Sequence, residues 1–156
     1  MRYSLPFLLA AALAAQTAPQ LAITGDLPAP LEMSLAGLPR ETATLLDEKT
    51  NQRVSYEGVP VEEFLKKAGL PLGKDLRGKG LAIYLLAEAK DGYQVVFSLG
   101  ELDSSLSGAR VIVADRREGK PLAEYEGPLR LVIDGDKRPA RSVRMLEKLE
   151  VVRLRK

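Results

Sequence analysis

The 156-residue chain contains no cysteine, no histidine and no tryptophan, and only 5% of its residues are aromatic. Without cysteine, the chain supplies no disulfide, no thiolate nucleophile and no thiolate ligand for zinc or an iron–sulfur cluster. Without histidine, Ser-His-Asp triads, histidine metal sites and imidazole acid–base chemistry are excluded as well. We therefore expect the folded chain to be stabilised by core packing rather than by covalent or metal cross-links.

Excess charge of one sign is also missing. The formal net charge is +2, with 46% hydrophobic and 28% charged residues. This composition and length predict one soluble domain with a sizeable core. A general nucleic-acid-binding protein usually carries a basic face over much of the domain, so we expect no nucleic-acid partner.

The first residues have the pattern of a secretory signal peptide. Arg2 precedes an apolar run from Leu5 to Ala15, and small-residue patterns predict cleavage after Ala14, Ala15 or Ala18. The run is shorter than the roughly 20 residues that span a bilayer. We predict a signal peptide over residues 1–18, a single domain over 19–156, a periplasmic or secreted location and no membrane attachment after cleavage. The alternative is an uncleaved N-terminal anchor.

Short apolar or alternating runs, bounded by turn residues, predict most of the chain to be β-structure. The predicted strands are Leu21–Thr24, Leu31–Leu35, the hairpin 41–47 and 52–58, Leu81–Ala87, Tyr93–Phe97, Arg110–Asp115, residues 128–134 and Leu149–Leu154. The run Leu81–Ala87 is nearly all apolar, which favours a central strand buried on both faces. The alternating cations of the C-terminal strand are typical of a protected sheet edge.

Helical signals are fewer and shorter. Pro60 opens a stretch whose apolar residues recur at helical spacing, and Gly69 ends it. Ser98 and Glu101 form a capping-box pattern. Around Ser34 the pattern leaves a strand and a capped helical turn as alternatives. Because strands outnumber helices and few helices lie between them, the predicted fold class is α+β, with a mixed, β-rich, layered architecture.

The densest charge lies in "IDGDKRPARSVRML", which holds Lys137, Arg138, Arg141 and Arg144. If this segment is helical, Arg141 and Arg144 share a face, because they are three residues apart. Backbone N–H groups and arginines together make an anion site. The alternative is a solvated loop whose cations are balanced by nearby carboxylates.

A second basic pair, Arg116 and Arg117 in "ADRREGKPL", either extends this patch or belongs to a polar turn.

Three segments in this order carry a resemblance to a known family. They are "YEGVPVEEFLKKAGL", "DGYQVVFSLGELD" and "VIVADRREGKPLAEYEGPLRLVIDGDKRPARSVRMLEKLEV". The chain resembles the oxidoreductase molybdopterin-binding domain of the sulfite oxidase family over about Ala29–Leu154. It is most similar to small exported bacterial proteins built from that domain alone. The resemblance implies a mixed, layered β-fold around a molybdenum–pyranopterin cofactor, with one cysteine ligand, a tyrosine beside the metal and basic residues near the pterin phosphate.

The resemblance assigns roles to several residues. Tyr93, in "DGYQ", corresponds to the active-site tyrosine. Arg144, in "RSVRML", corresponds to a basic residue close to the cofactor, and Arg141 and Ser142 belong to the loop that approaches the pterin. Lys137 and Arg138 precede that loop and are candidates for the same cofactor-binding surface.

The cysteine ligand has no counterpart. The corresponding region reads "TATLLDEKTNQ", where Leu46 and Asp47 are the nearest equivalents. A carboxylate is a harder and weaker donor to high-valent molybdenum than a thiolate. We therefore assign no metal ligand, although Asp47 alone could bind a cation.

These observations favour an exported, non-redox binding module for a small anion or a pterin-like ligand near Tyr93 and residues 141–144. One alternative is an oxidoreductase that holds molybdenum cofactor through the pterin dithiolene alone. Another is a structural subunit that docks on an exported partner protein through the edge of the C-terminal strand, Leu149–Leu154.

Overall fold

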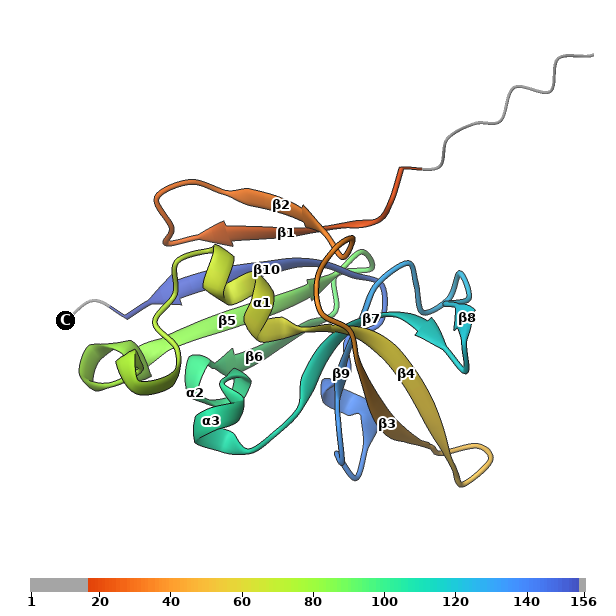
Figure 1. Ribbon diagram of the computed structural model, residues 1–156. Coiled ribbons are helices and arrows are strands. Elements are labelled where there is room, and N and C mark those ends of the chain that lie inside the picture. Colours follow the sequence, from red (N-terminus) through yellow and green to blue (C-terminus); the bar gives the residue numbers. More distant parts are fainter. Residues whose placement is uncertain (1–16, 155–156) are drawn as a thin grey trace, which may run out of the picture.

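The computed structural model describes residues 17–154 and places ten β-strands in two sheets (Figure 1). The predicted signal peptide lies almost wholly outside the described residues. Within residues 17–154, none of the helices has the length and apolarity needed to cross a membrane. The predicted β-rich α+β class is confirmed, because short helices only connect or flank the two sheets.

The first sheet, sheet A, has five strands in the order β2-β1-β10-β5-β6. The C-terminal strand β10 runs parallel to β1 on one side and antiparallel to β5 on the other. The strands of sheet A are β1 (Gln20–Gly25), β2 (Leu31–Ser34), β5 (Ile83–Ala89), β6 (Gln94–Ser98) and β10 (Leu146–Arg153).

The second sheet, sheet B, has the order β3-β4-β7-β8, and β9 also pairs with β7. Its strands are β3 (Glu41–Asp47), β4 (Gln52–Pro60), β7 (Val111–Arg117), β8 (Lys120–Pro121) and β9 (Arg130–Ile133). Sheet B curls strongly: Asp134, directly after β9, accepts a hydrogen bond from the backbone N–H of Thr44 in β3 at 2.7 Å. This curl encloses the space in which the candidate site lies.

The helices are short. They are α1 (Val61–Lys67), α2 (Leu99–Leu102), α3 (Ser104–Ser107) and the 3-10 turns η1 (Gly73–Asp75), η2 (Gly78–Ala82) and η3 (Pro139–Arg141). The predicted signals at α1 and α2 are confirmed. Gly69 adopts a positive φ of 76° directly after α1, and Ser98 and Glu101 form a reciprocal capping box at α2.

The core divides at strands β7 and β9 of sheet B: β9 and the first four residues of β7 are buried on both faces. The larger cluster fills the space between sheet A, one face of sheet B and α1. The smaller cluster lies inside the curl of sheet B; its buried members are Ala43, Leu45, Val54, Tyr56, Ile112, Ala114 and Val132. Every residue of β9 is buried, including Arg130, which lies on the face of the smaller cluster.

Two predictions about where strands lie in the sheet were wrong. β10 is a central strand and not an edge, since it pairs with β1 and β5. Its charges face solvent on one side of sheet A, where Lys148 pairs with Glu88 of β5 at 3.4 Å. The neighbouring β5 is fully buried on one face only, because its other residues lie on this same solvent-facing side.

Candidate anion-binding cleft

A charged network lies inside the curl of sheet B. Arg130 is 4% exposed and Glu126 is 1% exposed. Nη1 of Arg130 donates hydrogen bonds at 2.7 Å both to Oε2 of Glu126 and to the hydroxyl of Tyr56. The Tyr56 hydroxyl in turn donates to Glu126 at 3.2 Å. Burial is the main cause that raises the pKa of Tyr56, so its hydroxyl keeps its proton near neutral pH.

Arg117 extends the network to the end of β3. It donates to Oδ2 of Asp47 at 3.0 Å and to Oε1 of Glu126 at 3.5 Å. The guanidinium carbons of Arg130 and Arg117 lie 4.9 and 5.9 Å from the centre of the Tyr56 ring. Two cations and two carboxylates therefore neutralise one another around one aromatic ring, as charges at such low exposure require.

Asp47 is, with Leu46, the nearest equivalent of the metal-binding cysteine that the resemblance implies. Its carboxylate accepts hydrogen bonds from the backbone N–H groups of Lys49 at 2.9 Å and Thr50 at 3.3 Å, besides the pairing with Arg117. These backbone hydrogen bonds, assisted by Arg117, lower the pKa of Asp47. Its oxygens are thus engaged in holding the turn after β3.

The residues present do not fit a molybdenum centre ligated by the protein. The whole sequence contains no thiolate, and Asp47 is already paired. Among residues 17–154, no group of three or more carboxylate side chains is placed to hold a metal ion. The donor set that molybdenum receives in the resembling family is therefore missing here.

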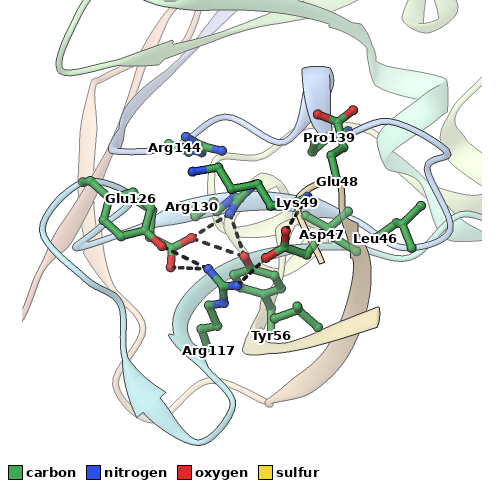
Figure 2. A pocket seen from close by; sticks show the side chains of 13 residues that line it. Leu46, Asp47, Glu48, Lys49, Tyr56, Arg117, Glu126, Arg130, Pro139 and Arg144 are labelled. Atoms are coloured by element: carbon green, nitrogen blue, oxygen red, sulfur yellow. Dashed lines mark hydrogen bonds and ion pairs between the residues drawn. The ribbon is translucent and has the colours of Figure 1, made fainter. Parts of the chain in front are cut away.

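Part of the Arg130 guanidinium makes no hydrogen bond. Its Nε is closed off from solvent and has no hydrogen-bond partner, and within the described chain no hydrogen bond is made by Nη2. Arg130 lines a cavity of about 240 Å³, here called the inner cavity, whose walls also include Lys49 and Arg144. Figure 2 shows Arg144 near Arg130, with no dashed line to any carboxylate drawn.

The inner cavity adjoins an outer cleft of about 440 Å³, with which it shares part of its wall. The residues that line both are Glu48, Tyr125, Pro139 and Arg144. The outer cleft adds Tyr93 and Arg138, and Arg144 lies over the Tyr125 ring at 6.0 Å. Two exposed arginines and two exposed tyrosines thus surround one hollow. Such a surface suits an anion attached to a flat or apolar body.

The structure brings four of the six predicted site residues to this outer cleft: Tyr93, Arg138, Ser142 and Arg144. The Tyr93 hydroxyl donates to the backbone carbonyl of Ala140 at 2.6 Å and so ties the start of β6 to the cleft wall. Ser142 is 4% exposed, and its hydroxyl accepts a weak hydrogen bond from the N–H of Ile133 at 3.4 Å. A ligand-binding role for these residues stays a prediction.

Arg141 and Arg144 do not share a helical face, because the segment between them is not helical. The 3-10 turn η3 ends at Arg141, and Ser142 has the non-helical ψ of 88°. Arg141 pairs with Asp136 at 2.8 Å and Glu101 at 2.9 Å, and the hydrogen bonds to Asp136 raise its pKa.

Arg141 therefore lies away from the cleft and joins the loop to α2. Lys137 is exposed and lines neither hollow.

Sequence reasoning missed the inner residues Lys49, Tyr56, Tyr125, Glu126 and Arg130. One signal was present. Arg130 interrupts the apolar run "PLRLVI", and a lone cation in a buried strand needs a buried partner. That partner, Glu126, lies four residues earlier, but no local pattern distinguishes it from the exposed Glu124.

The fold and the cleft together define an α+β protein of two packed sheets with a basic hollow at the mouth of the curled sheet. The model of the family described as "Oxidoreductase molybdopterin binding domain" matches residues 36–156. Since this match covers most of the chain, the protein belongs to that family, and the predicted membership is confirmed.

A solved structure supports the fold. The chain is similar to the sulfane dehydrogenase SoxCD from Paracoccus pantotrophus, with 23% sequence identity and a TM-score of 0.62. The match covers 86% of this chain but only 38% of that chain. A comparison with curated proteins gives no match.

Replacing Glu126 by glutamine should destabilise the protein by about 3–5 kcal/mol, because a buried guanidinium loses its main counter-charge. Chemical denaturation of the E126Q variant measures this loss. Glu124→Gln is the matched control: the side chain is exposed and its loss should change stability by less than about 0.5 kcal/mol. Equal stability of the two variants would contradict the claim that the buried ion pair between Glu126 and Arg130 stabilises the fold.

Proposed function

We propose that this protein is a non-redox member of the molybdopterin-binding family that binds an anionic ligand in the cleft between Arg130 and Tyr93. The ligand is a small oxyanion, or a pterin-like molecule that carries one. The observation that carries the proposal is the incomplete pairing of Arg130, a buried guanidinium that lines the inner cavity and whose Nη2 makes no hydrogen bond within the described chain. The family membership supports the position of the binding site in the fold, and the residues of the cleft support the class of ligand.

The arrangement around Asp47 supports the non-redox part of the proposal. The nearest polar equivalent of the family's thiolate is a carboxylate that is paired with Arg117 and fixed by two backbone N–H groups. Freeing that carboxylate for a metal would leave Arg117 with one longer ion pair, to Glu126 at 3.5 Å, and a hydrogen bond to the Tyr125 hydroxyl at 3.1 Å. The network therefore favours the metal-free state of this position.

The charges that remain after internal pairing support anion binding. Asp47 and Glu126 are matched by Arg117 and Arg130. In the described part of the chain, Lys49, Arg138 and Arg144 make no ion pair, and Glu48 and Asp91 are the two acidic residues beside them in the cleft walls. The surplus is positive, and guanidinium groups bind planar or tetrahedral oxyanions through paired N–H donors.

The tyrosines indicate what the anion is attached to. Tyr93 and Tyr125 are 49% and 57% exposed and belong to the outer cleft, whereas Arg130 lies at the inner end. An oxyanion at the inner end would direct the rest of a larger ligand toward these rings. A pterin carrying a phosphate has this division into a charged end and a flat end.

Titration with inorganic phosphate at constant ionic strength tests the site. We expect saturable shifts of the Nε–H signals of Arg130 and Arg144 in ¹H–¹⁵N spectra. Arg144→Gln should weaken binding about tenfold, because one charge-assisted contact is lost. A pterin monophosphate, followed by its fluorescence, should bind more tightly than phosphate if the outer cleft contributes.

The control for this titration is Arg116→Gln. Arg116 is an exposed arginine of β7 that lines neither hollow. It should leave the phosphate affinity unchanged. Equal weakening in both variants, or shifts that chloride reproduces at the same ionic strength, would reduce the effect to general charge screening and overturn the proposal.

Metal analysis distinguishes the proposal from the oxidoreductase alternative. Protein purified from a host that makes molybdenum cofactor should contain far less than one molybdenum per chain. A family member that retains the cysteine, purified in the same way, is the control and should contain about one molybdenum per chain. Stoichiometric molybdenum would favour the alternative. Sulfite and S-oxide activity, with Tyr93→Phe as the variant, would then be the next measurement.

The proposal includes a cellular location. The apolar stretch Leu5–Ala15 supports export to the periplasm or beyond. N-terminal sequencing of protein recovered from the periplasmic fraction should begin directly after Ala14, Ala15 or Ala18. Recovery of a chain that still begins at Met1 from the membrane fraction would favour an uncleaved anchor instead.

A further inference from the structure

The turn between β3 and β4 forms part of the wall of the inner cavity. Glu48 and Lys49 both lie in this turn, and both line the cavity. Each side chain is exposed, and neither makes an ion pair in the described part of the chain. The turn therefore carries a carboxylate and an ammonium group side by side. Its backbone conformation determines which of these two charges an anion in the cavity meets.

Asp47, the last residue of β3, fixes this backbone conformation. Its Oδ1 accepts hydrogen bonds from the N–H of Lys49 at 2.9 Å and from the N–H of Thr50 at 3.3 Å. Its backbone carbonyl accepts the N–H of Asn51 at 2.8 Å. Asn51 has a positive φ of 54°, a left-handed conformation that asparagine adopts more readily than most residues. Side chain and backbone of Asp47 together hold the turn in one compact form.

The other carboxylate oxygen of Asp47 joins the turn to the charged network. Oδ2 accepts a hydrogen bond from Nη2 of Arg117 at 3.0 Å, drawn as a dashed line in Figure 2. Arg117 also donates to the hydroxyl of Tyr125 at 3.1 Å, and both residues line the inner cavity. One carboxylate thus sets the position of Lys49 relative to other parts of the cavity wall. Because its charge is paired with Arg117, it does so without adding an unpaired negative charge to the site.

We infer that Asp47 positions Lys49 to bind the anion together with Arg130 and Arg144. Asp47 acts through the backbone of the turn and is a positioning residue, whereas Lys49 contacts the ligand. The nearest polar equivalent of the family's metal-binding cysteine thereby serves an anion site. The inference rests on the proposed anion binding and adds to it the part played by the β3–β4 turn.

Two substitutions of Asp47 separate positioning from charge. Asp47→Ala and Asp47→Asn both remove the negative charge beside Arg117, so the effect of that charge on phosphate affinity is the same in both. Only asparagine keeps a side-chain oxygen that can accept the N–H groups of Lys49 and Thr50. We expect the Kd for inorganic phosphate, titrated at constant ionic strength, to be about fivefold higher in Asp47→Ala than in Asp47→Asn.

A double-mutant cycle with Lys49 shows whether the effect passes through this lysine. Lys49→Gln should weaken phosphate binding about fivefold, because one charge-assisted contact is lost. In the Lys49→Gln background the difference between the two Asp47 variants should disappear, since no ammonium group remains to be positioned. Lys120→Gln is the matched control: Lys120 is exposed on β8, lines neither hollow and should leave the phosphate affinity unchanged.

Circular dichroism checks that the variants fold. If Asp47→Ala does not, Asp47→Glu replaces it in a comparison with wild type, because the longer side chain keeps the charge but moves the carboxylate out of the turn.

Equal phosphate affinities of the paired Asp47 variants, or a difference between them that persists in the Lys49→Gln background, would overturn the inference. An unchanged affinity in Lys49→Gln would do the same. The proposed anion site would survive these results if Arg144→Gln still weakens binding. A wild-type protein that shows no saturable binding of phosphate would remove the proposed function and this inference together.

Discussion

A guanidinium enclosed within a β-sheet has to be neutralised and hydrogen-bonded, and this requirement at Arg130 organises the second half of the protein. The short segment from Glu126 to Arg130 supplies both the cation and its counter-charge. Its backbone also binds the following loop: the N–H groups of Met145 and Leu146 donate to the carbonyls of Glu126 and Leu129. The same segment that buries the ion pair therefore fixes the position of Arg144 at the cavity wall.

The network also bears on the chemistry that the family fold can perform in this chain. A thiolate after β3 would be an electron-rich ligand available to a metal. The carboxylate of Asp47 is instead paired with Arg117 and hydrogen-bonded to the backbone of the turn that follows it. The outer cleft keeps two arginines, Arg138 and Arg144, which line it together with two tyrosines. The absence of the thiolate and the proposed binding of an anion are consistent with one another, because the internal carboxylates already balance the innermost cations.

Local patterns predicted the elements of the fold well. The hairpin of β3 and β4, helix α1, the capping box of α2 and the α+β class are all encoded in short stretches of sequence. The site was harder to predict. Tyr93 and Arg144 were found through the resemblance, but Tyr56, Glu126 and Arg130 come together only when sheet B curls, and no sequence spacing reports that curl. Arg141 was misplaced for a related reason, since its direction depends on a single non-helical ψ at Ser142.

The error at β10 shows how charge along a strand should be interpreted. Alternating cations protect an edge, but they equally mark a central strand whose sheet has one face in water. The neighbouring strands distinguish the two cases. Lys148 of β10 lies opposite Glu88 of β5, so its charge is paired within the sheet, as expected for a central strand. By the same criterion β6 is exceptional, because it is an edge strand that presents no charge at all.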